Sequence, residues 1–304
     1  MRFQKWLNKN TESLVGKTVA ISGSKGGLGK HLCRYLAYLG ADIILLDRNR
    51  ARSEANKLSI EAEFPGVKVS LLSVDLVDSY SVASATEELK ELAPDIFIHN
   101  AGAYSIPRCT SNSGYDNVYT INFVSPYYMI RELMPILQKK QGRAVVVGSI
   151  AHNYSKINDS DIDFSTVKAA SKVYGNAKRF LMFSLYELFR DEKDATLSVT
   201  HPGITFTNIT AHYPKLIYAL IKHPMKVIFM RPERAALSIV KGFFAPTEYH
   251  TWYGPRLFDV WGLPSKKRLK TCSVGESQRI AKIANDVYSD VKNKIEAKVA
   301  SAEG

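Results

Sequence analysis

Short apolar segments alternate with longer segments of helical character along most of the chain. The apolar segments lie at residues 17–22, 41–47, 67–75, 95–100, 143–149 and 196–201. Their nearly continuous apolar character is typical of strands that are buried on both faces of a parallel sheet. Segments of helix length lie between them, at residues 28–39, 51–64, 79–93, 115–138 and 164–190. This strict alternation predicts an α/β fold with a doubly wound parallel sheet and helices on both of its faces.

The chain of 304 residues shows no linker, internal repeat or low-complexity segment, so we expect a single domain. That domain is expected at residues 17–275, after an N-terminal lead at residues 1–16. Residues 276–304 are predicted to form a C-terminal amphipathic helix and tail, because apolar residues recur there at spacings of three and four. These apolar residues are Ile280, Ile283, Val287, Val291, Ile295 and Val299.

The three cysteines, Cys33, Cys109 and Cys272, lie far apart and form no CxxC pair. Their spacing excludes a disulfide framework and a thiolate metal cluster, and it favours a reducing compartment. The histidines show no metal-ligand spacing, so no metal site is predicted. The sequence also shows no secretory signal and no apolar run long enough to span a membrane, so we expect a cytoplasmic protein.

The net charge of +12 is concentrated in one region. Residues 211–272 hold eleven Lys or Arg against three Asp or Glu, an excess of eight. Such a patch suits nucleic acid, an anionic membrane surface, an anionic substrate, or simply contact with water. We expect no nucleic-acid binding, because the region has no aromatic-basic stacking pattern and no recognised nucleic-acid module. Peripheral contact with a membrane surface stays open beside the plain solvated face.

A glycine-rich loop, SGSKGGLG at residues 22–29, follows the first predicted strand and opens the first predicted helix. Glycines at this place let the backbone approach a pyrophosphate, and the helix N-terminus offers free N–H groups. We therefore expect Ser22, Gly23, Gly27, Leu28 and Gly29 to contact a dinucleotide cofactor. The alternative is an ordinary tight turn.

Asp47 ends the second predicted strand. A carboxylate there can accept hydrogen bonds from both hydroxyls of the adenosine ribose, which favours NAD over NADP. Arg48 follows directly and suits the 2′-phosphate of NADP instead. A helix N-terminal cap is the plain structural alternative for Asp47.

Seven motifs along residues 17–207 resemble, in order, those of the short-chain dehydrogenase/reductase family. They are the glycine loop, VDL at 74–76, HNAG at 99–102, IN at 121–122, VVVGS at 145–149, YGNAK at 174–178 and HPGITFT at 201–207. The segment from Ser149 to Tyr174 and the HPG are similar to the retinol-dehydrogenase-like branch. His99 stands where the family often has Asn, and Gly148 where a second serine is frequent. The resemblance implies a Rossmann-type three-layer α/β/α domain.

The resemblance implies a catalytic set of Asn122, Ser149, Tyr174 and Lys178. A second Tyr-x-x-x-Lys pair, at residues 218–222, follows the Pro-Gly loop, so the motif order selects Tyr174. Tyr174 would be the acid/base, and Lys178, one helical turn later, would lower its pKa and bind the nicotinamide ribose. Ser149 would bind the substrate oxygen, and Asn122 would support Lys178 through a water-linked relay. Taken singly, Ser149 also suits a strand-end cap and Asn122 a buried helix amide.

The resemblance also implies further contacts to the cofactor. Asp75 and Leu76 would lie at the adenine, although an Asx turn at the strand end is equally open for Asp75. The other expected contacts are Asn100, Ala101 and Gly102 after the fourth strand, and Pro202, Gly203, Thr205 and Thr207 at the nicotinamide. Glycine turns are the plain alternative for both of these segments.

Together these features predict an NAD(P)-dependent oxidoreductase that interconverts an alcohol and its carbonyl. A segment at about 208–237 occupies the place of the family's variable substrate lid, and its apolar side chains suggest a steroid, a retinoid or another lipid-like substrate. The resemblance also implies a homodimer or homotetramer. The alternative function is a non-catalytic sensor that binds a dinucleotide and partner proteins on the same fold.

Overall fold

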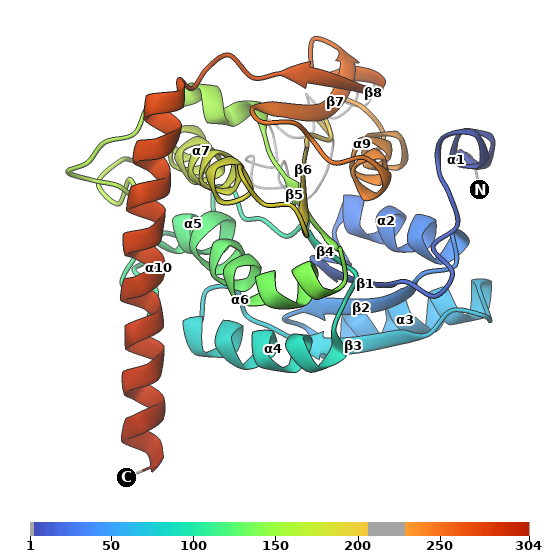
Figure 1. Ribbon diagram of the computed structural model, residues 1–304, viewed down its shortest axis with the longest axis horizontal. Coiled ribbons are helices and arrows are strands. Elements are labelled where there is room, and N and C mark those ends of the chain that lie inside the picture. Colours follow the sequence, from blue (N-terminus) through green and yellow to red (C-terminus); the bar gives the residue numbers. More distant parts are fainter. Residues whose placement is uncertain (1–2, 206–228, 304) are drawn as a thin grey trace, which may run out of the picture.

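The computed structural model describes residues 3–205 and 229–303, and one eight-stranded sheet lies at its centre (Figure 1). The strand order is β3-β2-β1-β4-β5-β6-β7-β8, and every neighbouring pair is parallel except β7 and β8. The strands are β1 Thr18–Ser22, β2 Asp42–Asp47, β3 Val69–Ser73, β4 Ile96–His99, β5 Arg143–Val147, β6 Thr196–Thr200, β7 Thr251–Leu257 and β8 Trp261–Arg268. The six predicted strands are therefore confirmed, and two more extend the sheet.

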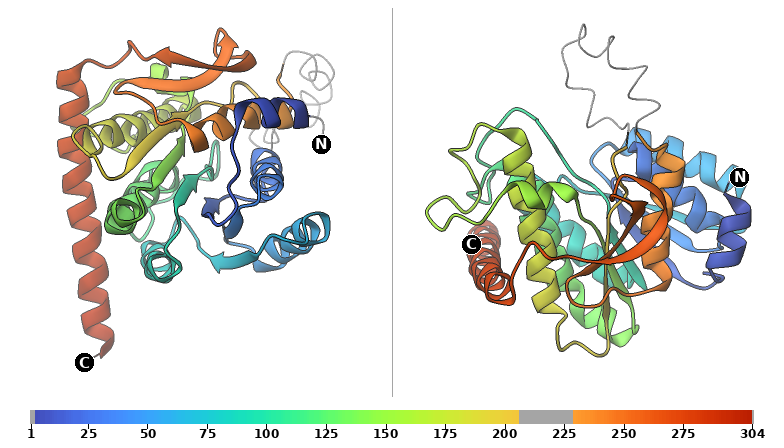
Figure 2. Two further views of the ribbon diagram at one scale, coloured as in Figure 1. Left: turned by 45° about the vertical axis from the view of Figure 1, so that its right-hand side comes forward. Right: turned by 90° about the horizontal axis from the view of Figure 1, so that it is seen from above.

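Helices cover both faces of this sheet. On one face α2 Gly27–Tyr38, α3 Arg50–Glu63 and α9 Pro232–Phe244 share an apolar core with the short α1 Gln4–Asn10. On the other face lie α4 Ser79–Leu92, α5 Asn117–Tyr119, α6 Ser125–Lys139 and α7 Ala170–Leu188. The three-layer α/β/α architecture is thus confirmed, and Figure 2 shows the two helical layers from further directions.

The long C-terminal helix α10, Val274–Glu303, runs along the layer of α7, α6 and α4 (Figures 1 and 2). Of the six apolar positions that the sequence pattern marked, it buries four and half-buries Ile283, while Val299 is exposed; the buried ones are Ile280, Val287, Val291 and Ile295. Near its start, Glu276 forms an ion pair with Arg179 of α7, whose side chain is almost fully buried. Arg179 also donates to the carbonyls of His152 and Thr271, so α7, α10 and the segments before each of them are joined at one point.

Two boundaries differ from the sequence-based expectation. The predicted helix at 164–190 begins only at Ala170, because residues 155–169 form turns that include Phe164 with a positive φ of 56°. The lid expected at about 208–237 overlaps a core helix at its end. Residues 232–237 belong to α9, where Ala235, Ala236 and Leu237 are fully buried in the core. Most of the remaining lid, with Tyr218 and Lys222, lies outside the described residues.

Candidate active site

The glycine loop between β1 and α2 is built by close backbone approach. Gly23 has a φ of +72°, and a Cβ on it would lie 2.8 Å from the Cα of Ala101. A side chain on Gly29 would overlap the carbonyl oxygen of Gly23. Helix α2 begins here with Gly26 at its N-cap, which has no side chain to accept hydrogen bonds. The N–H groups of the first turn of α2 are therefore not capped by a side chain and stay available to a ligand. Such a loop provides a cradle for an anionic group.

Ser22 and Asn100 join this loop to the segment after β4. The Asn100 side-chain amide donates to the Gly23 carbonyl at 2.9 Å and to the Ser22 carbonyl at 3.3 Å. The Ser22 hydroxyl in turn accepts from the backbone N–H groups of Asn100 and Ala101 at 3.2 Å. These predicted cofactor residues therefore hold the two sides of the cradle at a fixed separation. His99 lies beside them, with Nδ1 3.1 Å from the Ser22 hydroxyl.

Asp47 does not present a free carboxylate at the end of β2. It is buried, and its Oδ2 accepts hydrogen bonds from the hydroxyls of Ser24 and Ser53. Burial raises the pKa of Asp47, and the two serine hydroxyls and the nearby Lys25 counteract part of that rise. The predicted reading of Asp47 as an open receptor for ribose hydroxyls is therefore not supported. Its serine partners satisfy it from within the fold.

Arg48 and Asp75 face one another at the same edge, 3.6 Å apart as an ion pair between exposed side chains. The Asp75 carboxylate also accepts from the N–H of Val77, which is the Asx turn that the sequence left open. Leu76 is buried, and its carbonyl accepts from the hydroxyl of Ser125. Asp75 thus shapes the turn after β3, while its charge stays at the edge where an adenine would lie.

The four predicted catalytic residues come together at the carboxyl ends of β4 and β5. Lys178 Nζ donates to the carbonyl of Val147 at 2.9 Å and lies 5.7 Å from the ring centre of Tyr174. A Cβ on Gly102 would lie 2.9 Å from Asn122 Oδ1 and 3.9 Å from Lys178 Nζ, so Asn122 and Lys178 face the same small space. Ser149 caps the 3-10 turn η2, Ile150–Tyr154, and its hydroxyl is also hydrogen-bonded to Tyr174.

Asn122 lies in a π-helical turn, η1 Thr120–Val124, that interrupts the helix between α5 and α6. Its amide group donates to the carbonyls of Ala103 and Val118, both at 2.8 Å, while its buried Oδ1 has no hydrogen-bond partner among the described residues. A buried acceptor without a partner is costly unless a water or a ligand reaches it. The unpaired oxygen faces the Lys178 side, where a bridging water would complete the predicted relay.

The two titrating groups are shifted in opposite directions by burial. Burial lowers the pKa of Lys178 to about 7, with no compensating acidic neighbour. Burial raises the pKa of Tyr174 to about 12, and the hydrogen bond to Ser149 lowers it only in part. The expected lowering of the Tyr174 pKa by Lys178 is therefore absent in the protein alone. At pH 7 Tyr174 is therefore neutral, whereas Lys178 is close to the midpoint of its titration and is about half protonated.

The loop after β6 carries the predicted nicotinamide contacts. Gly203 has a φ of +82°, and a side chain there would meet Pro255 and the Val260 carbonyl at 2.8 Å. The loop is thus pressed against the β7–β8 hairpin, and Pro202 is buried in it. Thr205 forms an isolated parallel bridge with Met230. Thr207 lies outside the described residues.

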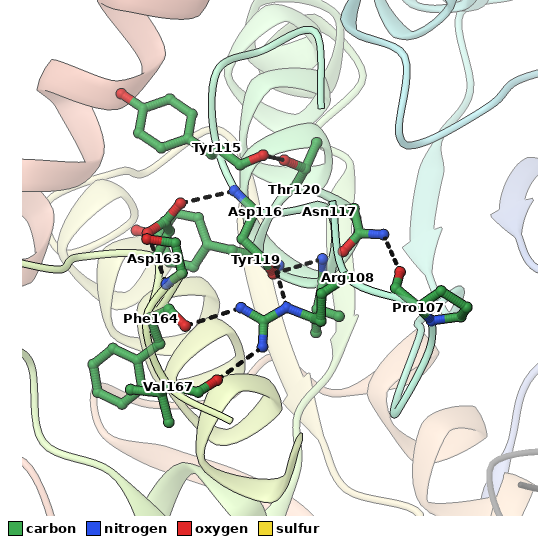
Figure 3. A network of polar contacts seen from close by, with 12 residues as sticks. Pro107, Arg108, Tyr115, Asp116, Asn117, Tyr119, Thr120, Asp163, Phe164 and Val167 are labelled. Carbon is green, nitrogen blue, oxygen red and sulfur yellow. Dashed lines mark hydrogen bonds and ion pairs between the residues drawn. The ribbon is translucent and has the colours of Figure 1, made fainter. Parts of the chain in front are cut away.

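A polar network joins the loop after β4 to the segment before α7 (Figure 3). The Arg108 guanidinium pairs with Asp116 and donates to the carbonyls of Phe164 and Val167. Asp116 also caps α5, and its backbone N–H donates to Asp163 at 2.7 Å. These contacts hold the segment between Ser149 and Tyr174 against the loop that follows β4. They thereby fix the positions of the two segments that flank the predicted catalytic residues.

Sequence reasoning missed two residues at this site. Tyr104 packs edge-on against Tyr174 with 5.4 Å between ring centres, and its negative charge, when ionised, would raise the Tyr174 pKa. The hydroxyl of Ser24 donates a hydrogen bond to the carboxylate of Asp47. The position of Ser24 inside the glycine loop was a usable signal, but nothing in the sequence marked Tyr104.

In the part of the chain that the structure describes, no group of His, Cys, Asp and Glu side chains is placed to hold a metal ion. Among the described helices, none combines the length and the apolar character that crossing a membrane requires.

A glycine-walled cradle at the start of α2, beside a clustered Asn, Ser, Tyr and Lys, defines a dinucleotide-binding oxidoreductase fold. The residues present fit such a cofactor, because the close-packed glycine loop leads into a helix start without a side-chain cap, and the buried Asn122 Oδ1 lacks a partner among the described residues. The profile of the short chain dehydrogenase family matches residues 17–214, which is more than half of the chain. The protein therefore belongs to the short-chain dehydrogenase family.

Relatives of known name agree with this assignment. Human retinol dehydrogenase 14 is 29% identical over 245 residues, which cover 74% of this chain and 73% of the relative. An uncharacterized oxidoreductase of Schizosaccharomyces pombe, C736.13, is 30% identical over 258 residues, covering 80% and 76%. The similarity to the retinol-dehydrogenase-like branch is confirmed by human retinol dehydrogenase 14 and by human retinol dehydrogenase 13.

Solved structures share the fold at lower identity. A putative uncharacterized protein from Mycobacterium paratuberculosis superposes with a TM-score of 0.70 at 21% identity, covering 94% of this chain and 95% of that one. A short-chain dehydrogenase from Sphingobium yanoikuyae in complex with NADPH superposes with a TM-score of 0.58 at 22% identity, and the match covers 75% of this chain and 84% of that one.

Proposed function

We propose that the protein interconverts an alcohol and its carbonyl with a nicotinamide dinucleotide. The observation that carries this proposal is the clustering of Asn122, Ser149, Tyr174 and Lys178 beside the glycine cradle. A protein that only bound the dinucleotide would have no need of the tyrosine hydroxyl at this place. The cofactor, when bound, supplies or accepts the hydride.

The residues of the chain have distinct roles in this proposal. In the reducing direction Tyr174 gives its phenolic proton to the substrate oxygen, and Ser149 donates a hydrogen bond to the same atom. Lys178 stabilises the phenolate that remains, because its buried ammonium can be protonated near neutral pH. Asn122 holds the water through which Lys178 exchanges a proton with the surroundings. The oxidising direction uses the same steps in reverse.

We infer that the cofactor is NADP rather than the NAD favoured from the sequence. Asp47 is buried, and its carboxylate already accepts hydrogen bonds from the hydroxyls of two serines. We therefore do not expect it to bind the ribose hydroxyls of the cofactor. Cations gather there instead: Arg48 is exposed, and the Lys25 ammonium lies 3.4 Å from the Asn49 carbonyl. Two positive side chains at the end of β2 suit a 2′-phosphate.

The substrate class is proposed from the relatives and the sequence. A retinol dehydrogenase relative makes a hydrophobic alcohol, such as a retinoid, a steroid or another lipid, the first choice. The residues 206–228 that hold most of the predicted lid lie outside the described part. The homodimer or homotetramer implied by the family resemblance stays a prediction, as does the location in the cytoplasm.

An absorbance screen tests the function. Purified protein is mixed with NAD(H) or NADP(H) and with panels of steroid, retinoid and aliphatic alcohols and carbonyls, and the reduced cofactor is followed. Turnover that needs Tyr174 supports the proposal. Cofactor binding without turnover of any panel member would instead support the non-catalytic sensor.

A further inference from the structure

The hairpin of β7 and β8 exposes a group of large apolar side chains at one end of the molecule. Leu257, Phe258, Trp261 and Leu263 are 53%, 86%, 40% and 44% exposed. The other exposed large apolar residues of the described chain lie at least twelve residues apart from one another along the sequence, at Val15, Leu58, Tyr80, Leu92, Tyr154, Val274 and Val299. Four within seven residues is a patch, and exposed apolar patches mark surfaces that bind something. We call these four residues the hairpin tip.

The backbone of the hairpin tip holds Phe258 outward in an unfavourable conformation. Leu257 pairs with Trp261 across the turn, and both Phe258 and Asp259 between them have positive φ, 51° and 58°. Glycine, Asn or Asp is usual at such positions, and a bulky aromatic side chain is an outlier there. Folding gains little from a strained phenylalanine in water. This points to a use for the side chain outside the fold.

Basic side chains surround the hairpin tip. Arg256, Lys266, Arg268 and Lys270 are all exposed on or next to the two strands. Lys266 pairs with Glu248, and Lys267 with Asp259, so most of the local acid is already balanced. Apolar side chains bordered by cations complement a lipid surface with acidic headgroups, where the apolar groups enter the acyl boundary and the cations meet phosphate.

The register of the sheet places the hairpin tip at the edge that holds the active site. Strand β7 runs parallel to β6, and Tyr253 pairs with Thr200 near the end of β6. Residues 254–257 therefore continue beyond the carboxyl end of β6, toward the edge at which a doubly wound sheet binds its ligands. The contacts of Gly203 with Pro255 and Val260, and of His201 Nε2 with the Asp259 carbonyl at 3.1 Å, join the hairpin to the nicotinamide loop. Figure 1 shows β7 and β8 together at the upper end of the molecule.

We propose that the hairpin tip docks the protein on an anionic lipid surface and so brings the active-site edge to substrates dissolved in that surface. The inference has two parts, docking on lipid and access to a substrate dissolved in it, and only the second part rests on the proposed function. Docking is a binding property of the hairpin tip and is measured without any turnover. A failure of docking can therefore be distinguished from a failure of the proposed function.

The test is flotation of the intact chain with lipid vesicles. One set contains phosphatidylcholine alone, and the other also contains about one third phosphatidylserine, each at low and at high salt. We expect binding to the anionic vesicles at low salt and a several-fold weaker binding at high salt, since salt screens the cations. Absence of binding to anionic vesicles at low salt overturns the proposal.

Paired variants locate the surface. Leu257→Ser with Phe258→Ser should weaken vesicle binding at least about tenfold, because two apolar side chains no longer enter the lipid. Phe258→Trp should bind the vesicles as well as the wild type does, because an aromatic ring suits the interface. Leu58→Ser is the control: Leu58 is 59% exposed on α3, at the opposite edge of the sheet, and its replacement should change nothing. Equal binding by the hairpin variant and the wild type overturns the proposal.

A second arm tests the charges and the rival occupant. Arg256→Gln with Arg268→Gln should remove most of the preference for anionic vesicles, whereas Lys68→Gln at the far edge should not. Size-exclusion chromatography is run on the same proteins without lipid. A dimer that is present in the wild type and lost in the Leu257→Ser, Phe258→Ser variant, without vesicle binding, would assign the hairpin tip to a second copy of the chain and overturn the lipid proposal.

Discussion

Lys178 donates a hydrogen bond to the carbonyl of Val147 at 2.9 Å, and its ammonium lies 5.7 Å from the ring centre of Tyr174. The lysine is buried with no acidic partner, so its pKa is lowered to about 7, while burial raises the pKa of Tyr174 to about 12. Near pH 7 the tyrosine is therefore not ionised in advance, and the lysine is only partly protonated. A bound cofactor, with its hydroxyls and its charge, would have to complete the tuning of the tyrosine.

Tyr174→Phe should reduce turnover by at least about 100-fold, because the variant has no proton to give or take. Cofactor affinity should change little, because the cradle of glycines is untouched. Turnover is measured with a substrate found in the absorbance screen, and affinity by quenching of protein fluorescence. The exposed Tyr154, on the turn after Ser149, is the matched control, and Tyr154→Phe should behave as wild type. Tyr218→Phe is expected to do so too. Full activity of Tyr174→Phe would remove it from the reaction.

Lys178→Met should make the protein without cofactor more stable at neutral pH. The lysine pKa is about 7 when folded and about 10.5 when unfolded, so between these values the unfolded chain binds more protons and the stability of the wild type rises with pH. Below about pH 7 the wild type bears the full cost of charging the buried amine. We expect a gain of about 1–3 kcal/mol at pH 7 in the variant, reduced by the unpaired Val147 carbonyl.

The gain should shrink toward pH 10.5, and urea unfolding at several pH values from about 6 to about 10 measures it. The exposed Lys172 lies on the same helix, so Lys172→Met serves as the control and should show no such trend. A constant difference between Lys178→Met and the wild type at every pH would show that the buried amine does not titrate as described.

The sequence predicted strands β1 to β6 because each is a largely apolar run. Five of them are buried on both faces, whereas the edge strand β3 is only partly buried. Strands β7 and β8 escaped prediction because Gly254, Pro255, Gly262 and Pro264 are poor strand formers. Motif order identified Tyr174 and Lys178 as neighbours. The state of Asp47 depended instead on hydrogen bonds from Ser24 and Ser53, which sequence spacing does not reveal.

Lys25→Gln combined with Arg48→Gln should weaken NADP(H) binding by about 10–100-fold and leave NAD(H) binding within about threefold. The loss comes from removing two cations that would contact a 2′-phosphate. Isothermal titration with both cofactors measures it. Lys68→Gln removes one exposed cation just before β3, at the amino edge of the sheet, and should leave both affinities unchanged. If the double variant loses affinity for both cofactors alike, the two cations act on the pyrophosphate or on folding, and the inferred NADP preference is wrong.

Gly175→Ala should impair both folding and the reaction, although Gly175 touches no reacting group. A side chain there would overlap the carbonyl oxygen of Ala151, so α7 or the turn η2 has to move. We expect a loss of about 1–3 kcal/mol in the free energy of unfolding. Ser149 directly precedes η2, and Tyr174 lies on α7. If these two elements move apart, the hydrogen bond between Ser149 and Tyr174 should lengthen, and kcat should fall at least about tenfold.

Gly275→Ala in the first turn of α10 is the matched control. A Cβ there meets nothing within 4 Å, so we expect unchanged turnover and a stability that is equal or higher by up to about 1 kcal/mol. Urea unfolding and steady-state kinetics on both variants measure the contrast. Equal behaviour of the two variants would mean that α7 and η2 have room to separate, and that the glycine beside Tyr174 does not set the distance between Tyr174 and Ser149.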